Sequence, residues 1–488
     1  MTTPTSDRAA PRARARQRVL TALGCAAALS MTLPACSGAT ASALLGKDGG
    51  AGSSSGGSSG GGGGSSSGGS SGGGSGSSSG GTGSSSGGGD ASVDDGGGCA
   101  TSVHGTVWDP AKLHPVYNAI VYVPSAPLDP IATGPSCDPC GSPPSGKPLA
   151  VALSGPDGTF TLEGVPPGTD VPIVVQIGKW RREGALIPAV TACADTAVPD
   201  DLTRLPRSRG EGHLPRIAVS TGLDSMECAL QSMGIDAAEF TDSTGPGRVH
   251  LYQGGATTGA TAGAATASAS TLWASAAVLD QYDMVLDACQ GAAPTDKPQA
   301  SLDNLVAYAA KGGRVYLSHY EDFVLWPTGE TSPWSSTASQ DVAMPSNQTA
   351  SNIAIDLGFP KGNALAHWAL GVGAATQLGN IATINNARAD VLSVTPPSKG
   401  WLRGNVTGVA QTTNVYQYSF YAGASACGKV AYSDFHVSAG AQAVAAFPTE
   451  CATAGPDPGA TDLFEFFFLD ALSCAQDDSI APQPPPLK

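Results

Sequence analysis

Residues 47–98 are almost entirely glycine and serine, and this run determines how the rest of the chain can be organised. It offers almost no apolar side chain whose burial would offset the entropy lost on ordering. A flexible segment of this length spans roughly 40 Å. We therefore expect a disordered tether that holds the following 390 or so residues away from whatever precedes it. A chain of that length predicts two domains.

The segment before the tether has the pattern of an export signal. Five arginines and one aspartate lie within the first eighteen residues, and an apolar stretch from Val19 to Ala35 follows. This combination predicts a secretory signal peptide over residues 1–35, because seventeen residues are too few for a stable membrane span. The sequence Leu33-Pro34-Ala35-Cys36 resembles the bacterial lipobox, which implies a lipid anchor on the thiol of Cys36 and residues 36–98 as anchor and tether. Ordinary cleavage with a free secreted product is the alternative, and Cys25 is a poorer second site.

Charge and cysteine content restrict the compartment and the partners. The formal net charge is −15, and removal of five arginines and one aspartate with the leader lowers it to −19. Such an acidic chain is not expected to bind nucleic acid, which requires cations against phosphates. Nine cysteines follow the tether, and in an exported chain they predict disulfides, with at least one thiol left over. The disulfide candidates are Cys99, Cys137, Cys140, Cys193, Cys228, Cys289, Cys427, Cys451 and Cys474.

Short strands separated by turn residues follow the tether. The candidate strands are residues 103–109, 119–124, 159–163 and 171–177. This pattern predicts an all-β sandwich over residues 99–205. The order Gly-x-Val at Gly105, Val-x-Val at Val121, Asp-Gly-x-Phe-x-Leu from Asp157 and Pro-x-Gly from Pro166 resembles the carboxypeptidase regulatory-like, transthyretin-like family. The resemblance implies a non-catalytic module that serves as a spacer, folding aid or adhesive unit.

Cys137-Asp-Pro-Cys140 within this region has three interpretations. A redox pair requires the first cysteine at a helix N-terminus, whereas these flanks are loop-like. A zinc site requires two further ligands at partner spacing, and no second Cys-x-x-Cys exists. Structural disulfides are therefore favoured over a metal site or a redox site.

From residue 213 the pattern changes to strands that alternate with helices. Strands are expected at residues 215–222, 248–252, 282–289, 314–320 and 427–436, and helices at residues 223–233, 301–312 and 462–472. This alternation predicts an α/β doubly wound parallel sheet over residues 213–476. The segment 326–410, rich in Ser, Thr, Asn and Gly, is expected to be a large insertion with a helix near 364–370. Residues 477–488 are expected to be a disordered tail.

Three motifs in this second region carry a resemblance. They are Tyr-Asp-x-Val at Tyr282, Gly-Gly-Arg-Val at Gly312 before a strand that ends in His319, and Gly-Lys-Val-x-Tyr-Ser at Gly428. Together they resemble the class I glutamine-amidotransferase-like fold and its ThuA-like branch, over roughly 215–325 and 425–475. The whole layout resembles a set of uncharacterised bacterial surface lipoproteins, and that resemblance implies no established activity.

The candidate site residues are those that follow the strands of the expected sheet. Ligands of open α/β sheets bind beyond the carboxyl ends of the strands, where His319, Asp434, His436 and Cys289 all fall. An amidotransferase needs its cysteine on a Gly-x-Cys-x-Gly elbow, and Asp287 replaces the first glycine here. The Cys hydrolase interpretation is therefore weak.

Two further interpretations of these residues remain. A metal site formed by His319, Asp434 and His436 would need a further ligand, which Glu321 or Asp322 would supply. The favoured interpretation is that all these polar groups are satisfied at strand ends, in a fold that has lost its chemistry. No catalytic residue, metal or cofactor is assigned.

Two functional hypotheses follow. The first is a tethered, non-enzymatic binding or structural module on the outer membrane or cell surface, or in the periplasm, whose partners are the membrane through its lipid and an unidentified envelope or extracellular ligand. The second is an extracytoplasmic hydrolase or carbohydrate-modifying enzyme that uses the ThuA-like domain. The incomplete elbow favours the first.

Overall fold

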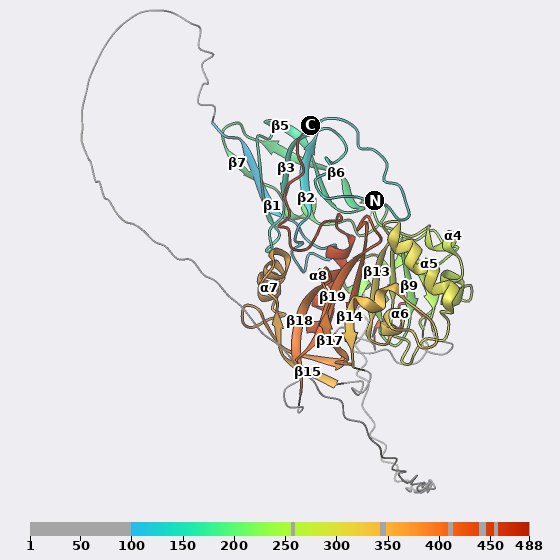
Figure 1. Cartoon of the computed structure of the whole chain (residues 1–488). Coiled ribbons are helices and arrows are strands. Elements are labelled where there is room, and N and C mark those ends of the chain that lie inside the picture. Colours follow the sequence, from blue (N-terminus) through green and yellow to red (C-terminus); the bar gives the residue numbers. More distant parts are fainter. Residues whose placement is uncertain are drawn as a thin grey trace, which may run out of the picture. The chain divides into compact units, whose positions relative to one another are not determined.

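The computed structural model describes residues 99–254, 259–341, 348–407, 413–438, 446–452 and 457–487. The expected signal peptide, the lipidation site Cys36 and the tether lie outside these ranges. The described part is a mixed α/β protein with large sheets and few helices (Figure 1). All described residues belong to one compact unit. Within them, no helix combines the length and the apolar character needed to cross a membrane.

The first part of the described chain contains two sheets. Strand order is β4-β1-β7 in one and β3-β2-β5-β6-β8 in the other. The bounds are β1 Ser102–Thr106, β2 Ile120–Pro124, β3 Pro148–Leu153, β4 Thr159–Glu163, β5 Gly168–Ile177, β6 Trp180–Val190, β7 Asp195–Ala197 and β8 Gly212–His213, with the short helix α1 at Asp200–Thr203. Val103, Phe160, Val121 and Val175 share one buried core, so the two sheets pack as a sandwich. The expected strands are present, and β3, β6, β7 and β8 were not predicted.

The tight turn before β4 explains one motif of the sequence. Gly158 has a φ of +73°, and a Cβ at this position would lie 2.7 Å from the Val107 carbonyl oxygen. Only glycine avoids both the strained φ and this contact. The Asp157 carboxylate accepts hydrogen bonds from the Thr159 amide at 3.1 Å and the Thr159 hydroxyl at 2.7 Å. The Asp-Gly pair therefore fixes the entry into β4.

The second part is built on a ten-stranded sheet. Its strand order is β10-β11-β9-β12-β13-β20-β19-β18-β15-β16. The bounds are β9 Ile217–Thr221, β10 Phe240–Asp242, β11 Val249–Gln253, β12 Met284–Asp287, β13 Arg314–Ser318, β15 Gln348–Ile355, β16 Asn380–Ala387, β18 Lys399–Val406, β19 Thr413–Ala422 and β20 Gly428–Ser433. The six strands from β10 to β20 in this order are parallel, and the other four are antiparallel. The sheet is thus mixed, whereas the sequence predicted a parallel one.

The segment expected to be an insertion, residues 326–410, extends this sheet. It supplies β15, β16 and β18, a two-stranded sheet of β14 (Ala338–Gln340) and β17 (Val391–Val394), and helix α7 (Pro360–Val372). In β15 and β16 only three side chains of each strand are buried, those of Ala350, Ile353 and Ile355 in β15 and those of Ile381, Ile384 and Ala387 in β16. A strand that is buried on one face carries polar residues on the other. The Ser, Thr and Asn residues of these strands therefore gave the segment the composition of a loop, and it was expected to be an insertion.

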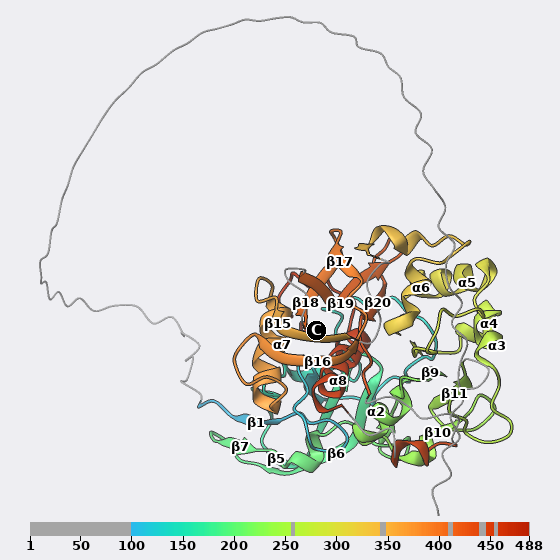
Figure 2. The same cartoon turned by 90° about the horizontal axis from the view of Figure 1, so that it is seen from below.

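Helices cover both faces of the parallel strands. They are α2 Met226–Ser232, α3 Ala269–Trp273, α4 Ala276–Leu279, α5 Gln299–Ala310, α6 Asp322–Leu325 and α8 Pro458–Leu472. In β12, Met284 and Leu286 belong to the core that contains α2 and α8, while Val285 belongs to the core that contains α3 and α5. Figure 2 shows α2 beside α8, with α3, α4 and α5 grouped apart from them.

Helix α8 joins the sandwich to the sheet. Tyr117 of the sandwich stacks on Phe466, with ring centroids 5.9 Å apart, and Trp180 meets Phe468 edge-on at 6.2 Å. His114 Nδ1 lies 2.8 Å from the Glu465 carboxylate. The helix is therefore buried on nearly every side, as its four phenylalanines require.

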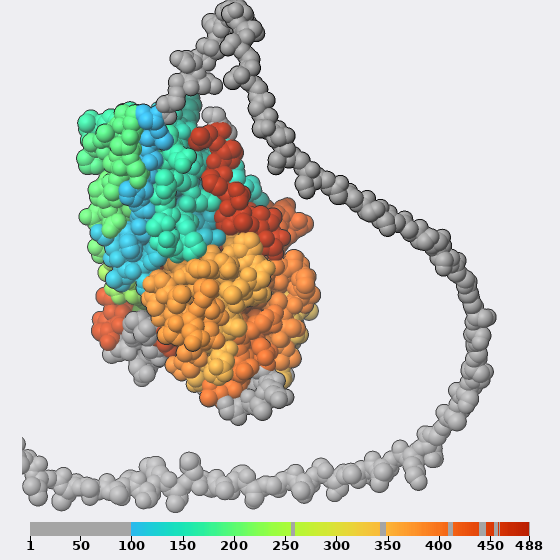
Figure 3. Space-filling model, turned by 90° about the vertical axis from the view of Figure 1, so that its left-hand side faces the viewer, coloured from blue at the N-terminus to red at the C-terminus, as the bar shows by residue number. Residues whose placement is uncertain are grey.

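The C-terminal segment, expected to be disordered, is described up to residue 487. It runs over the surface beside the sandwich (Figure 3). Asp478 is 2% exposed and lies 2.9 Å from both Lys361 Nζ and Lys429 Nζ. Asp470 of α8 pairs with the same two lysines. This balanced group of two cations and two anions fixes the start of the tail.

Four disulfides confirm the expectation that cysteines are oxidised. The pairs are Cys99–Cys193, Cys137–Cys427, Cys140–Cys474 and Cys228–Cys451. Cys137 and Cys140 each bridge to a distant cysteine, so neither thiol is available for a zinc or redox site. Among the described cysteines Cys289 alone is free, and it is buried. Disulfides of this number indicate an oxidising, extracytoplasmic environment.

Peptide mapping of the unreduced protein is expected to return these four pairs and a free thiol at Cys289. Replacement of both Cys140 and Cys474 by alanine should lower the free energy of unfolding by about 2–4 kcal/mol, because the unfolded chain loses a long-range constraint. Urea denaturation measures this change. A Cys137–Cys140 pair in the map would contradict the structure.

The junction at α8 predicts a pH dependence. Burial alone would lower the pKa of His114, but its hydrogen bond to Glu465 and the nearby Asp462 and Asp109 raise the pKa to about 9. Protonated His114 therefore stabilises the fold fully below about pH 6.5, and this contribution disappears as the pH rises through 9.

His114→Gln should cost about 2 kcal/mol near pH 6 and almost nothing above pH 9. His104→Gln is the matched control, because His104 sits in an exposed ion pair with Asp195 that contributes little. Urea denaturation across this pH range measures both. A His114→Gln penalty that does not change with pH would show that the ion pair is not its source.

Candidate functional site

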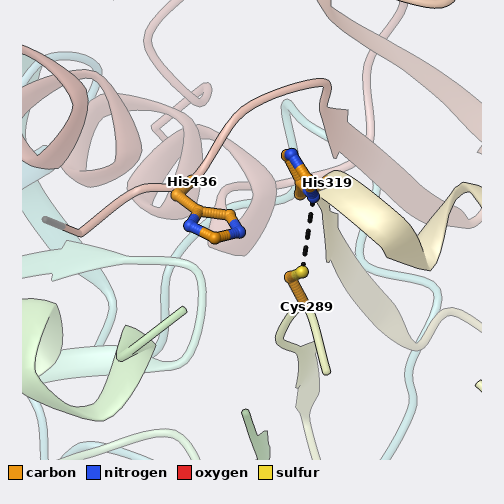
Figure 4. Close-up of side chains that lie close together, drawn as sticks. All are labelled: Cys289, His319 and His436. Atoms are coloured by element: carbon orange, nitrogen blue, oxygen red, sulfur yellow. Dashed lines mark hydrogen bonds between the residues drawn. The ribbon is translucent and has the colours of Figure 1, made fainter. Parts of the chain in front are cut away.

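Three of the candidate residues meet at the carboxyl edge of the parallel sheet. Cys289 follows β12, His319 follows β13 and His436 follows β20, and these three strands are neighbours. One potential ligand atom from each side chain lies within 4.8 Å of the other two. Figure 4 shows the three side chains close together, with His319 at the start of a short 3-10 helix (His319–Glu321). Parallel strands end at the same edge, which is why residues so distant in sequence converge.

The contacts within this group are close, and the group is closed to solvent. Cys289 Sγ lies 3.4 Å from His319 Nδ1, and the Gly291 amide donates to Sγ at 3.3 Å. The rings of His319 and His436 have centroids 4.4 Å apart. Cys289 is fully buried, His319 is 1% exposed and His436 is 8% exposed. We refer to these three residues as the Cys–His–His group.

Several ring nitrogens of the group lack partners. Both nitrogens of His436 and Nε2 of His319 are buried and make no hydrogen bond to any described residue. An unsatisfied buried polar atom costs about 1–3 kcal/mol, and most such atoms in folded proteins are paired. Three unpaired ring nitrogens in one group indicate that the site can bind a further ligand.

His319 adopts a strained backbone. Its φ is +49°, in the left-handed region that non-glycine residues rarely occupy. The Tyr432 hydroxyl donates to the His319 carbonyl oxygen at 2.8 Å and holds the residue in this conformation. Strain of this kind concentrates at functional sites, so the geometry at His319 supports a role beyond packing.

Asp224, which the sequence analysis did not single out, positions the loop that carries His436. Its carboxylate accepts hydrogen bonds from the Val437 amide at 3.0 Å and from the Ser438 amide at 3.0 Å and hydroxyl at 2.9 Å. The Leu223 amide, one residue earlier, donates to the Cys289 carbonyl at 2.7 Å. The loop between β9 and α2 thus ties two members of the group together. The position of this aspartate just after a central strand is the sequence feature that could have identified it.

Gly222 allows this loop to approach Cys289. A Cβ on Gly222 would lie 2.2 Å from the Cys289 carbonyl oxygen, which no side chain can accommodate. The glycine after β9 is therefore required by the close contact of two backbones.

Burial keeps Cys289 and His319 uncharged. Burial, with smaller contributions from His436 and Arg388, lowers the pKa of His319 to about 2. Burial also raises the pKa of Cys289 far above its usual range. Cys289 is therefore a thiol and His319 a neutral imidazole, which differs from the thiolate–imidazolium pair that activates a cysteine nucleophile.

Asp434 does not join the Cys–His–His group. Its carboxyl group accepts a hydrogen bond from the Asp390 amide at 3.0 Å, and one of its oxygens lies 3.0 Å from the Tyr432 hydroxyl oxygen. In the same cluster, Arg388 Nη2 lies 2.7 Å from Asp390 Oδ2 and 3.2 Å from Asp322 Oδ2. Burial raises the pKa of Asp434 well above its usual value, and the neighbouring Asp390 adds to this effect. Asp434 and Asp322 thus belong to a separate acidic cluster with its own cation.

Glu321, the other suggested ligand, pairs with a buried lysine. Lys297 Nζ lies 3.0 Å from Glu321 and 3.1 Å from Asp287. The same ammonium lies 4.8 Å from the centre of the Trp273 ring. Glu321 and Asp287 are fully buried, and the ammonium of Lys297 offsets the free-energy cost of removing their carboxyl groups from water. The metal interpretation of the sequence, with Asp434 and Glu321 or Asp322 beside the two histidines, is therefore not assembled, and Cys289 lies beside the histidines instead.

The larger cavities lie away from the group. A cavity of about 330 Å³ is lined by Asp283 and Arg314 at the amino ends of β12 and β13, and by Lys179 and Arg181 of the sandwich. Its cations bind protein partners: Lys179 pairs with Asp283 at 2.8 Å and Arg314 donates to the Ser473 carbonyl at 3.1 Å. Cys289, His319 and His436 line neither this cavity nor three others in the described part of the chain.

Cys289 should resist alkylation in the folded protein because it is buried and protonated. Iodoacetamide at about pH 8 is expected to leave the Cys289 peptide unmodified, whereas the same reagent in concentrated guanidinium chloride should modify it fully. Mass spectrometry of that peptide measures both states. Rapid modification without denaturant would indicate an accessible nucleophile and favour the hydrolase hypothesis.

Comparison with known proteins gives no family. No protein-family model and no curated protein matches this chain. Solved structures that it resembles include "mmIFT52 N-terminal domain" (8% identity, TM-score 0.31, 53% of this chain and 97% of that one). Others are the cytoplasmic proteins STM1381 (11%, 0.28) and STM3548 (11%, 0.26) of Salmonella typhimurium, each over 53% of this chain and 98% of theirs. With TM-scores this low, these resemblances support no conclusion about fold or function.

Proposed function

We propose that this chain is an exported lipoprotein of the bacterial cell envelope, anchored through Cys36, whose folded part is a non-enzymatic binding or structural module. The Gly/Ser-rich residues 47–98 would hold the module roughly 40 Å from the membrane. The outer membrane or cell surface is the proposed location, with the periplasm as the other possibility. Its partners are the lipid bilayer and an envelope or extracellular ligand.

The observation that carries the export proposal is the set of four disulfides. Eight of the nine cysteines after residue 98 are paired, over sequence separations of 94 to 334 residues. Cytosolic thiols are kept reduced, so a chain that depends on such bridges has to fold in an oxidising compartment. The arginine-rich leader is the means of reaching it.

The state of Cys289 supports a non-enzymatic role. A cysteine hydrolase needs an accessible thiolate beside a base, and Cys289 is a buried thiol with a raised pKa. Asp287 occupies the position where the nucleophile elbow would have its first glycine, and it pairs with Lys297.

The hydrolase remains the second candidate because of one contact. Cys289 Sγ and His319 Nδ1 are 3.4 Å apart, which is the arrangement of a nucleophile and its base. Catalysis through this pair would require the loops around it to open and admit a substrate. The closed geometry favours the first candidate.

The domain identities are part of the proposal. We assign residues 99–205 to a carboxypeptidase regulatory-like sandwich and residues 213–476 to a ThuA-like amidotransferase-like domain. Support comes from the turn at Gly158 in the first and from the parallel strands β9 to β13 and β20 in the second.

Metabolic labelling tests the anchor. Cells that express the full chain in radiolabelled palmitate should incorporate label into the protein, and Cys36→Ala should abolish incorporation because the thioether to diacylglycerol cannot form. Cys25→Ala is the matched control and should label as strongly as the wild type. Equal labelling of wild type and Cys36→Ala would refute the anchor as proposed.

A further inference from the structure

The Cys–His–His group offers a specific set of donor atoms. One is a thiol sulfur and two are imidazole nitrogens, and all come from side chains that are at least nine-tenths buried. Sulfur and imidazole ligands select copper or zinc, whereas magnesium and calcium require oxygen ligands. The chemistry of the group therefore points to a thiophilic transition metal.

The unpaired nitrogens supply an independent observation. His436 is 8% exposed, its two ring nitrogens bond to no described residue, and the ring faces His319. Nε2 of His319 is likewise without a partner among the described residues. A metal ion bound between the rings would give His436 the partner that the protein does not supply, and it would meet His319 at Nδ1, the nitrogen that faces the Cys289 sulfur.

The spacing of the donor atoms fits a three-coordinate ion. With metal–sulfur and metal–nitrogen bonds of about 2.3 and 2.0 Å, ligand atoms around a trigonal ion lie about 3.5–3.8 Å apart. Cys289 Sγ and His319 Nδ1 are already 3.4 Å apart, and the third ligand atom is within 4.8 Å of both. Small side-chain rotations would complete the site.

We propose that Cys289, His319 and His436 bind one copper(I) ion. On binding, the Cys289 thiol loses its proton to solvent and its sulfur bonds to the ion, so that Cys–SH and Cu⁺ become Cys–S–Cu and H⁺ with no change in oxidation state. The resulting thiolate and Cu⁺ carry no net charge, which suits a site removed from water.

Zinc fits this site less well on two counts. Zn²⁺ with one thiolate leaves a net positive charge in a buried position, and it takes a fourth ligand. The nearby carboxylates are already engaged: Asp224 binds the Val437 and Ser438 amides, and Glu321 pairs with Lys297. Within the described residues the group contains only three ligands at metal-binding distance. Three soft or borderline ligands satisfy Cu(I).

The copper site does not depend on the lipid anchor, so an experiment can disprove either proposal without affecting the other. It also gives a use for the buried thiol that requires no substrate access. A sulfur bound to copper is not available as a nucleophile, so the copper site and the hydrolase exclude one another.

Competitive titration with Cu(I) tests the site. All proteins carry Cys25→Ala and Cys36→Ala, which leaves Cys289 as the one cysteine outside the four disulfides. The full chain is purified without oxygen and titrated with Cu(I) against a chromogenic Cu(I) chelator. We expect one copper per chain, and an affinity at least about 100-fold lower for Cys289→Ser and for His436→Gln. His367→Gln, on the exposed side of α7, is the matched control and should bind as the parent does.

Two further measurements keep the test decisive if a variant folds poorly. Cu(I) should raise the Tm of the parent and of His367→Gln, because a ligand that binds only the folded state stabilises it. Titration of the parent alone should produce a thiolate-to-copper absorption band that saturates at one equivalent. The absence of stoichiometric binding, or equal binding by folded Cys289→Ser, would overturn the proposal. Zinc bound in place of copper by the same three residues would keep the site and overturn the choice of metal.

Discussion

Burial of polar side chains at the ends of parallel strands is the constraint on which the second half of this protein depends. β12, β13 and β20 lie side by side and end at one edge, so the residues that follow them have to share one small volume. Asp287 and Glu321 are accommodated there by Lys297, and Asp322, Asp390 and Asp434 by Arg388. Cys289, His319 and His436 have no such partner. Cys289 and His319 remain uncharged instead, and the open ring nitrogens of His319 and His436 distinguish this group from its neighbours.

The rest of the architecture fixes the sandwich and the C-terminal segment to the sheet. Helix α8 packs between the sheet and the sandwich, and Cys137–Cys427 and Cys140–Cys474 attach a sandwich loop to the amino edge of the sheet and to the end of α8. Asp478 then fixes the C-terminal segment to Lys361 and Lys429. The ordinary cavities are on the sandwich side, whereas the Cys–His–His group is on the opposite edge.

The sequence predicted those parts of the fold whose patterns are local. β9, β11, β12, β13 and β20 are buried along nearly their whole length, so each contains consecutive apolar residues. β15 and β16 are buried on one face only. Their polar residues are typical of a loop, so these strands were not predicted and their segment was expected to be an insertion. Cys289, His319 and His436 could be selected because each follows a strand. Asp434 also follows a strand, but its side chain contacts the Tyr432 hydroxyl and the Asp390 amide and so lies in a different cluster. The role of Asp224 and the disulfide pairing depend on contacts between distant segments, which no local pattern encodes.

The central claim is that three side chains at one sheet edge form a copper centre. X-ray absorption at the copper edge of the loaded protein observes the ligands directly. The account predicts one sulfur neighbour at about 2.2–2.3 Å and two nitrogen neighbours at about 2.0 Å. A first coordination shell without sulfur would show that Cys289 does not bind the metal and would contradict the account.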